Sequence, residues 1–277
     1  MLRERVGVYV DQSNINMSGG YTMDYSVLRN FALRGEAQGV HLNVYSSFDA
    51  GKAERDPGWA SRFLGYQSAI RQLGYHLKMK QSQMFDDGEK KICKANVDVD
   101  IAVDIMESAA RLDRIVLLTG DGDFATLIQA ARRLGSRVEV IAFDNCSAML
   151  REAADAVFPG WLIPGLLPTD SGRARLRGII EEISVQGSEL GVIRYLRDDL
   201  INTQPLMPMA PENCGYAIFH NDSVRVTDQS ILRGAVVEFT PHESDADEGE
   251  QIEIRAVDIQ PLRIATRSGW YKPFMVA

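Results

Sequence analysis

The sequence predicts an α/β domain followed by a small all-β barrel, and three observations along its 277 residues support this. Over residues 5–159, short β-branched runs alternate with helical stretches, which is typical of βαβ units on a parallel sheet. From Gly191 onwards, apolar residues recur instead with period two, as in short barrel strands. Prolines and glycines concentrate between these regions, as in a linker. We expect an α/β domain at 1–160, a linker at 161–188 and a barrel domain at 189–277.

The α/β domain is expected to contain five strands, each a short apolar or β-branched run. They span Arg5–Asp11, Val40–Phe48, Tyr75–Met79, Arg114–Thr119 and Arg137–Phe143. Helical spacing of apolar residues, closed in three cases by a following glycine, predicts the helices between and after them. These are Tyr25–Gln38, Trp59–Leu73, Asp98–Leu112, Phe124–Leu134 and Ser147–Ala154. With right-handed crossovers, a strand order of 3-2-1-4-5 places the first and fourth strands side by side.

The barrel domain is expected to contain four short strands. They span Val192–Leu196, Tyr216–His220, Ala235–Phe239 and Ile252–Ile259. Two long inserts, Asp198–Asn213 and Pro241–Gln251, interrupt this region. In the linker, Arg173–Ile183 is expected to add one helix.

Composition and cysteine usage narrow the class of protein. The hydrophobic fraction of 45% and the charged fraction of 25% are average for folded globular proteins. The three cysteines, Cys93, Cys146 and Cys214, have no C-x-x-C spacing, which argues against a zinc site and a disulfide framework and fits a reducing cytoplasm. No apolar run approaches the roughly 18 residues of a membrane span. We expect a cytoplasmic protein without a membrane partner, and whether it forms a homo-oligomer stays open.

The net charge of −8 is unevenly distributed. Such a charge would ordinarily argue against nucleic-acid binding. Five acids and no Lys or Arg lie between Glu243 and Glu250, however, and this run is most simply a solvated loop between strands. Basic residues gather instead at 78–94 and 173–177. The net charge of −8 therefore does not decide whether the protein binds nucleic acid.

Acidic residues stand at the ends of two strands and at the start of one helix. Asp11 ends the first predicted strand, and Asp121 and Asp123 follow the fourth. Asp98 opens the helix that precedes the fourth strand. Ligands in an open α/β sheet bind beyond the carboxyl ends of the strands, where the strand order reverses. We therefore expect these carboxylates to lie close together.

Carboxylates in such proximity must be neutralised. Two unit charges ~4 Å apart repel by about 4 kcal/mol at an effective dielectric of 20. A hard divalent cation relieves this repulsion, and oxygen ligands without Cys or His select Mg²⁺ or Mn²⁺. Such a cation polarises a phosphoryl oxygen and lowers the pKa of a bound water. The pattern therefore indicates hydrolysis of a phosphate ester or a phosphodiester.

Each of these acids also has a purely structural interpretation. A helix cap accounts for Asp121 or Asp123 taken alone, and a favourable contact with the helix dipole accounts for Asp98. Asp11 is harder to explain in this way, because an acid that closes an apolar strand is costly without a partner. The coincidence of three such positions favours a functional site.

Three segments of the sequence resemble the NYN domains, a PIN-like nuclease family. They are VYVDQSN at 8–14, KANVDVDIAVD at 94–104 and LLTGDGDF at 117–124, in the family's order. The resemblance covers the whole α/β domain. It implies a PIN-like parallel sheet flanked by helices in a NYN nuclease domain, and a ribonuclease that depends on Mg²⁺ or Mn²⁺.

The resemblance also implies site residues. The acidic quartet that serves both catalysis and metal binding corresponds to Asp11, Asp98, Asp121 and Asp123. Asn14, Lys94 and Asp104 fall on further motif positions and are expected to support the site. Ala95 stands where the family often has a glycine, which leaves the quartet intact.

The barrel segments resemble a cold-shock-type OB-fold in their order and spacing. These segments are GVIRYL at 191–196, GYAIFHNDSV at 215–224, LRGAVVEF at 232–239 and RAVDIQPL at 255–262. The aromatic, glycine-rich first RNA-binding motif is missing. Tyr216 and Phe219, with Tyr195 and His220, are candidates to stack on RNA bases. Two alternatives stay open: these aromatics form the barrel core, or the barrel only docks on the nuclease.

The sequence thus predicts an endoribonuclease that cuts RNA phosphodiesters with a metal-activated water held by the aspartates. Lys90, Lys91 and Lys94 are expected to contact the RNA backbone at the rim of the site, with a plain solvated loop as the alternative. A catalytically silent RNA-binding or adaptor protein with the same fold remains open, although the intact quartet counts against it. A metal-dependent phosphatase also remains open, although Asp11 is not followed by the D-x-D pattern of one such class.

Overall fold

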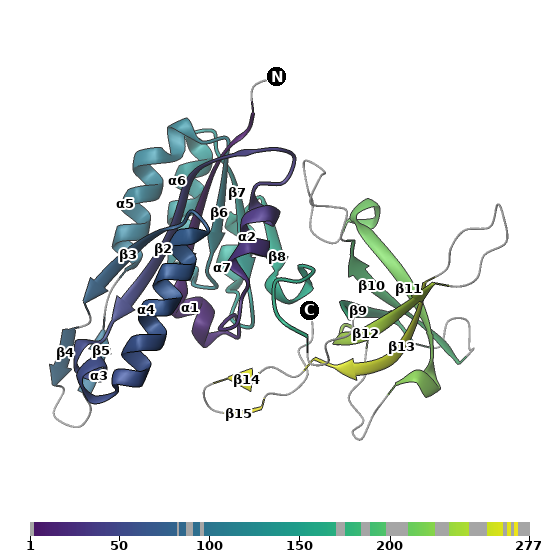
Figure 1. Cartoon of the computed structure of the whole chain (residues 1–277). Coiled ribbons are helices and arrows are strands. Elements are labelled where there is room, and N and C mark those ends of the chain that lie inside the picture. Colours follow the sequence, from purple (N-terminus) through teal and green to yellow (C-terminus); the bar gives the residue numbers. More distant parts are fainter. Residues whose placement is uncertain are drawn as a thin grey trace. The chain divides into compact units, whose positions relative to one another are not determined.

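The computed structural model describes two compact units, one formed by residues 1–21 with 25–158 and the other by 22–24 with 159–277 (Figure 1). The described residues are 3–81, 83–86, 91–94, 97–169, 175–183, 189–197, 210–224, 233–243, 254–262, 265–266 and 269–270.

The first unit is built on a six-stranded sheet in the order β3-β2-β1-β6-β7-β8 (Figure 1). The strands are β1 (Arg5–Asp11), β2 (Gln38–Phe48), β3 (His76–Gln81), β6 (Arg114–Leu118), β7 (Arg137–Ala142) and β8 (Ala156–Pro159). The pairs β3–β2, β2–β1, β1–β6 and β6–β7 are parallel. The predicted order 3-2-1-4-5 is therefore confirmed, and β8 extends the sheet beside β7.

Burial on both faces explains the apolar character of the central strands. Every residue of β6 and every residue of β1 after Arg5 is buried, as expected for strands that helices cover on both sides. Ile101 and Ile105 of α5 and Ile128 of α6 pack on one face, in a core that includes Tyr9 of β1. Helix α4 lies on the other face (Figure 1).

The five predicted helices are present, and four of them are shorter than predicted, whereas α4 begins two residues before the predicted Trp59. The helices of the first unit are α1 (Gln12–Met17), α2 (Tyr25–Ala32), α3 (Ala50–Arg55), α4 (Pro57–Gln72), α5 (Asp98–Ser108), α6 (Ala125–Arg133) and α7 (Ala148–Ala153). Short 3₁₀ turns occur at η1 (Ala109–Arg111) and η2 (Gly122–Phe124). The sequence did not predict α1, α3 or the antiparallel hairpin of β4 (Gln83–Asp86) and β5 (Lys91–Lys94).

Helix α2 ends at Ala32, whereas the sequence predicted a helix up to Gln38. Gly35 and Glu36 have φ angles of 70° and 58°, in the left-handed region. A right-handed helix cannot continue through such residues. Gln38 instead begins β2, so the predicted boundary was wrong by one turn and a half.

A buried ion cluster joins the end of α2 to the sheet. Arg34 donates two hydrogen bonds to Glu139 of β7, at 2.6 and 2.7 Å. Arg137 donates to the same carboxylate at 3.0 Å, and Arg114 of β6 lies 3.5 Å from it. Burial and the neighbouring Arg34 charge lower the pKa of Arg114. Arg114 also lies 3.0 Å from the carboxylate of Glu4. Since Arg34, Arg114 and Glu139 are almost completely buried, the Glu139 carboxylate compensates Arg34 and shares the compensation of Arg114 with Glu4.

The second unit contains a closed barrel in the order β10-β11-β13-β12-β9. Its strands are β9 (Leu176–Glu182), β10 (Leu190–Leu196), β11 (Cys214–His220), β12 (Val236–Glu243) and β13 (Ile254–Pro261). Shorter elements are η3 (Gly160–Leu162), η6 (Pro211–Asn213), η7 (Asn221–Ser223), β14 (Ala265–Thr266) and β15 (Gly269–Trp270). The predicted all-β barrel is therefore confirmed. Most of the two predicted inserts lies outside the described residues.

The helix expected at Arg173–Ile183 is wrong, because this segment provides the first barrel strand, β9. Gly178 is the reason the strand can pair closely with β10. A side chain there would meet the main-chain oxygen of Arg194 at 2.8 Å. The adjacent Ile179 and Ile180, which are β-branched, are both buried.

Among the described helices, none is long and apolar enough to cross a bilayer.

Candidate active site

The first acidic residue of the site, Asp11, is held at the end of β1 and is only 3% exposed. It caps α1, because its Oδ1 accepts a hydrogen bond from the main-chain N–H of Asn14 at 3.1 Å. Its Oδ2 accepts from the Thr119 hydroxyl at 3.4 Å. Burial, with smaller contributions from the charges of Asp98 and Asp121, raises the pKa of Asp11 to about 6 despite these bonds. A buried acid under such repulsion favours a cation as a partner.

The loop after β6 brings the second and third acids to the same edge of the sheet. Asp121 caps η2, and its Oδ1 accepts from the main-chain N–H of Asp123 at 3.0 Å. The structural interpretation as a cap is therefore correct for Asp121, yet a cap occupies one carboxylate oxygen and leaves the other available. The main-chain N–H of Asp121 is itself fixed by the Thr119 hydroxyl at 3.2 Å.

Asn14 connects this loop to α1. Its Oδ1 accepts from the main-chain N–H of Gly120 at 2.9 Å and from the Asn145 side chain at 3.3 Å. Gly120 must lack a side chain, because a Cβ there would lie 2.7 Å from the main-chain oxygen of Asn145. Asn14 therefore supports the site by positioning the β6–η2 loop. The sequence motif indicated Asn14 but not Thr119 or Asn145, because no spacing rule reveals their hydrogen bonds.

Asp98 completes the acidic group from the first turn of α5. Its pKa is raised by burial, then by the charges of Asp121 and Asp123, and it is lowered by Lys80. The four aspartates that the sequence predicted therefore interact electrostatically at the carboxyl edge of the sheet. Asp11 is buried, Asp98 and Asp121 are partly exposed, and Asp123 is exposed, so the group opens to solvent.

The four aspartates are the right kind of ligand for a hard divalent cation, but their side chains are not arranged around a single ion position. The donors are oxygens only, and their mutual repulsion is what such a cation relieves. In the part of the chain that the structure describes, however, no three His, Cys, Asp or Glu side chains converge as ligands of one ion. Ion binding would therefore require the aspartate side chains to turn or to bind through water.

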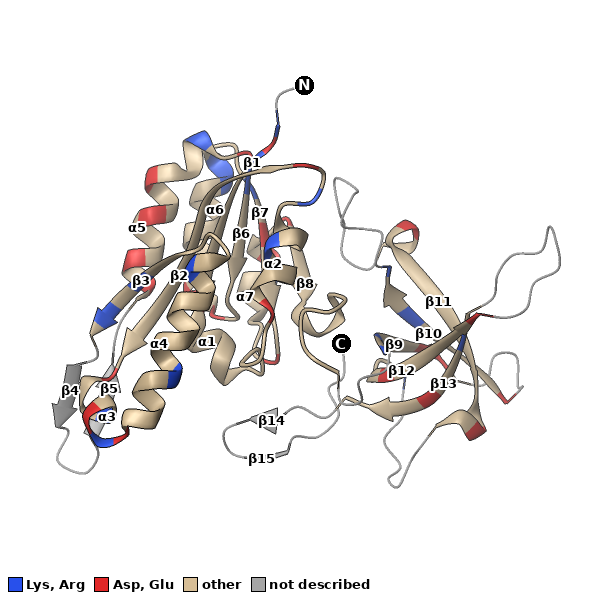
Figure 2. Cartoon of the chain, in the orientation of Figure 1, with Lys and Arg blue, Asp and Glu red and all other residues tan. Residues whose placement is uncertain are grey.

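Lysines on β3 neutralise the other acids of α5. Figure 2 shows the acidic residues along α5 and the basic residues on β3. Asp104 contacts the Tyr45 hydroxyl and the Lys78 ammonium group, and Asp100 lies 3.0 Å from Lys80. Asp104 therefore helps to attach α5 to the sheet, and no bond of Asp104 within the described residues leads directly to the quartet.

The other predicted lysines cannot be placed in the same way. Lys90 lies outside the described residues, and Lys91 and Lys94 lie on β5, where only the strand is described. Their expected contact with RNA stays a prediction.

The fold and this edge of the sheet agree with one protein family. The NYN-domain family model matches residues 5–162. The chain belongs to the NYN-domain family. NYN domains are PIN-like nucleases, and the match covers the first unit from residue 5 onwards, with all four aspartates.

Two of the proteins to which this NYN-domain chain is similar are the following. One is the low amplitude and bright protein LabA of Synechococcus elongatus, which is 29% identical over 159 residues, or 54% of this chain and 81% of LabA. The other is the crystal structure of a protein of unknown function from Vibrio parahaemolyticus, which is 24% identical with a TM-score of 0.44 and covers 56% of this chain and 91% of its own.

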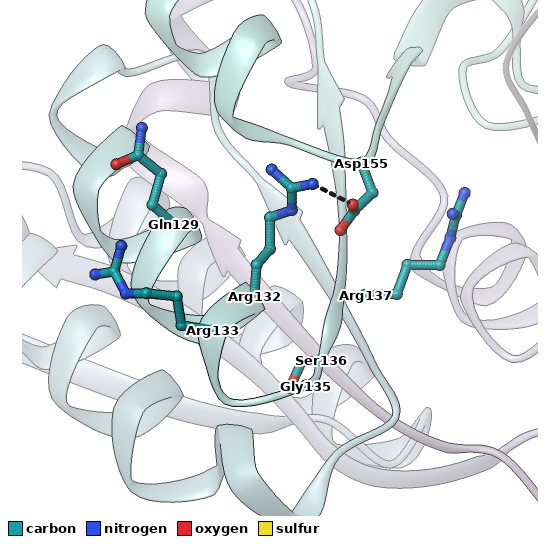
Figure 3. A pocket seen from close by; sticks show the side chains of 7 residues that line it. All are labelled: Gln129, Arg132, Arg133, Gly135, Ser136, Arg137 and Asp155. Atoms are coloured by element: carbon teal, nitrogen blue, oxygen red, sulfur yellow. Dashed lines mark ion pairs between the residues drawn. The ribbon is translucent and has the colours of Figure 1, made fainter.

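A pocket of about 580 Å³ lies away from the aspartates, at the amino end of β7 (Figure 3). Arg132 and Arg133 of α6 line it together with Arg137 and Asp155. Arg132 is 2.9 Å from Asp155 (Figure 3), and Arg137 is bonded to Glu139. Because parallel strands carry ligand sites at their carboxyl ends, the pocket does not belong to the acidic site of the NYN domain.

The barrel presents fewer aromatic groups than the sequence suggested. Phe219 is 2% exposed and packs in the barrel core, so the expectation that it stacks on RNA bases is wrong. Tyr195 packs edge-on against Phe239, at 5.7 Å between ring centroids. Tyr216 is 45% exposed and remains a candidate. The sequence could have distinguished the two residues. Successive side chains of a strand point to opposite faces, so Tyr216 and Phe219, three positions apart on β11, cannot both face the solvent.

Proposed function

We propose that this NYN-domain protein is a metal-dependent endoribonuclease. The observation that carries the proposal is the grouping of four aspartates at the carboxyl edge of the sheet, where burial, and after it the charges of Asp98 and Asp121, raise the pKa of Asp11. Membership of a PIN-like nuclease family supports the same reaction class.

The residues have separate tasks in this proposal. Asp11, Asp98, Asp121 and Asp123 would hold Mg²⁺ or Mn²⁺, which would polarise a phosphoryl oxygen and lower the pKa of a bound water. Asn14 joins the β6–η2 loop to α1, and Thr119 joins it to Asp11, so the backbone that carries Asp121 and Asp123 is held in place before RNA arrives. Such preorganisation is the main contribution that a protein makes to this kind of hydrolysis.

The test is incubation with single-stranded and structured RNA, with Mn²⁺ or Mg²⁺ against EDTA. Wild-type protein should cut RNA only with the cation, and Asp121→Asn should reduce the rate by at least about a hundredfold. Isothermal titration should show one or more divalent sites that weaken in Asp11→Asn. Cleavage in EDTA, or unchanged cation binding in Asp11→Asn, would contradict the metal assignment.

The lysines between β3 and α5 in the sequence are proposed to bind the RNA backbone. Lys90, Lys91 and Lys94 follow β3 and precede α5, whose first residue is Asp98. Each phosphate contact contributes roughly 0.7 to the slope of log affinity against log salt for a single strand. Changing the three lysines together to Ala should weaken RNA binding and flatten that slope while cation binding persists. An unchanged slope would show that this segment makes no phosphate contact.

A silent RNA-binding protein is the second candidate, because the aspartates do not converge on one point within the described residues. Such a protein would bind RNA without cutting it in any divalent cation. The phosphatase alternative predicts release of phosphate from a monoester, and the same reactions would detect it.

A further inference from the structure

Helix α6 ends in a basic turn that borders the pocket at the amino end of β7. Arg132 and Arg133 follow Gln129 by three and four residues, so all three lie on one face of the helix, and they line the pocket of about 580 Å³. They are exposed, whereas the other face of α6 is buried. In Figure 3, Arg133 lies beside Gln129 and Arg132 extends toward Asp155. The last turn of α6 therefore presents two guanidinium groups to one cavity.

Two contacts fix the orientation of the Arg132 side chain. Its Nη2 lies 2.9 Å from Oδ1 of Asp155, and its Nη1 donates to the main-chain oxygen of Ala153 at 2.9 Å. Asp155 is itself held, because its Oδ2 accepts from the main-chain N–H of Val138 at 2.8 Å. A guanidinium has five N–H groups, and the Arg132 side chain is still 42% exposed. Arg132 is therefore oriented before a ligand arrives and keeps donors for it.

Arg133 brings a second positive charge to the pocket. Within the part of the chain that the structure describes, Arg133 makes no ion pair, whereas Arg132 is paired with Asp155 and Arg137 with Glu139. The segment 125–138, which forms α6 and the wall of the pocket, holds three arginines and no acid. Cations gathered in this way attract an anion from solution.

The charge around the pocket stays positive when the nearby acids are counted. The buried ion cluster around Glu139 holds three arginines against two acids. The pair of Arg132 and Asp155 is neutral and Arg133 adds one charge, which leaves a net charge of +2. The start of β1, the end of α5 with η1, and α7 border this region. Their exposed charges balance in twos: Arg5 and Asp113, Glu107 and Arg111, and Arg151 and Glu152.

We infer that this pocket binds a doubly charged phosphate group, either free or carried by a small molecule. A phosphate monoester has a charge of about −1.5 to −2 near pH 7, which complements the net charge of the pocket. The planar fork of a guanidinium also matches the spacing of two phosphate oxygens. None of the described residues that line the pocket is aromatic, so the rest of the ligand is expected to be polar, such as a sugar that Gln129 can bind.

This phosphate site is separate from the acidic edge of the sheet and does not depend on the proposed ribonuclease function. Its ligand contacts come from α6 and the loop before β7, whereas the aspartates lie at the carboxyl ends of the strands. The inference can therefore be tested without RNA and without a divalent cation.

Isothermal titration of the whole protein, freed of divalent cations by dialysis, tests the pocket. The probes are inorganic phosphate, ribose 5-phosphate, ribose and acetate, at one ionic strength because salt screens exposed charges. Both phosphates should bind saturably, and ribose and acetate should not. Tighter binding of ribose 5-phosphate would identify the ester as the ligand, and tighter binding of inorganic phosphate would identify the free ion. No saturation by either phosphate up to about 10 mM, or equal binding of acetate, would overturn the inference.

Two variants locate the bound phosphate. Arg133→Ala breaks no ion pair among the described residues, so it should melt near the wild-type temperature and bind phosphate at least about tenfold more weakly. Gln129→Glu places a carboxylate one helical turn before Arg133 and should also weaken binding. Arg71→Ala is the matched control, because Arg71 is likewise an exposed arginine in the last turn of a helix, α4.

The variants can also contradict the site. Wild-type phosphate affinity in both Arg133→Ala and Gln129→Glu would overturn the inference, and equal weakening by Arg71→Ala would show that overall charge determines binding. Asp121→Asn should leave phosphate affinity unchanged, because Asp121 lies at the acidic edge. Stronger phosphate binding in Asp121→Asn would place the ion at that edge and overturn the pocket.

Discussion

At the residue scale, the site is determined by where Asp11 lies. A carboxylate at the end of a buried strand loses its hydration, and two hydrogen bonds do not restore it. The sequence revealed this residue because an acid that closes an apolar run is unusual. It could not reveal Thr119 or Asn145, since hydroxyl and amide groups in loops have no characteristic spacing.

Asp11 should destabilise the metal-free protein at neutral pH. Its folded pKa of about 6 exceeds the ordinary value of 3.8, so the unfolded chain ionises more readily and stability falls as pH rises from about 4 to 6. Asp11→Asn should therefore raise the free energy of unfolding by about 2 kcal/mol at pH 7 and change little at pH 4. Urea unfolding in EDTA at both pH values measures this.

Asp113 provides a control of opposite sign. Hydrogen bonds from Arg5 hold the pKa of Asp113 below its usual range, so its charged form is stabilising above that range. Asp113→Asn should lower stability at pH 7. The account of Asp11 would be contradicted if Asp11→Asn also destabilised the metal-free protein at pH 7.

Gly120 should be intolerant of a side chain. A Cβ there meets the side chain of Asn145 and its main-chain oxygen, the latter at 2.7 Å, so Gly120→Ala must displace the loop that carries Asp121 and Asp123. We expect RNA cleavage to fall at least tenfold, with a loss of stability of about 1–3 kcal/mol. Gly65→Ala is the control, because Gly65 is helical with open space around it and should leave cleavage unchanged. Equal cleavage rates of both variants would show that RNA cleavage does not depend on the position of the loop that carries Asp121 and Asp123.

At the element scale, long and buried elements were predictable and short or exposed ones were not. The apolar runs of β1 and β6 and the spacing in α5 and α6 carry strong signals. Helices α1 and α3 have six residues each, too few to show a period. In β9, Gly178 and two neighbouring isoleucines gave no clean alternation, so a helix was predicted where the barrel needs a strand.

The ion cluster around Glu139 should be essential for holding the end of α2 against β6 and β7 of the sheet. Glu139→Gln removes the carboxylate that Arg34 and Arg114 share, while Glu4 still lies 3.0 Å from Arg114. We expect a loss of about 3–5 kcal/mol in the free energy of unfolding, mainly from the buried charge of Arg34. Glu107→Gln, an exposed change on α5, should alter stability by less than about 0.5 kcal/mol. Denaturant titration compares the two. Similar stability of both variants would show that the Glu139 carboxylate is not needed to stabilise these buried arginines.

At the scale of the whole molecule, the order of the strands determines which residues meet. Asp11, Asp98 and Asp121 are far apart in the chain and come together because β1 and β6 are neighbours and α5 precedes β6. The sequence predicted this meeting from the strand order and the family resemblance.

The barrel should add affinity for RNA through Tyr216. Its exposed ring can stack on a base, whereas Phe219 cannot. Tyr216→Leu should weaken RNA binding about fivefold and leave the cleavage rate of bound RNA unchanged. Leu190→Ala, a change of a partly exposed apolar residue on β10, serves as the control. Unchanged binding in Tyr216→Leu would favour a barrel that does not contact RNA.

The central claim is that the aspartate group cuts RNA with a divalent cation and water. The most direct measurement maps the ends of the RNA products made with Mn²⁺ or Mg²⁺ by wild-type protein, Asp98→Asn and Asp100→Asn. Both acids lie in the first turn of α5, but Asp100 is paired with Lys80. We predict products with 5′-phosphate and 3′-hydroxyl ends from wild type and Asp100→Asn, and almost none from Asp98→Asn. Products with 2′,3′-cyclic phosphate ends, or equal cleavage by Asp98→Asn and wild type, would contradict the account.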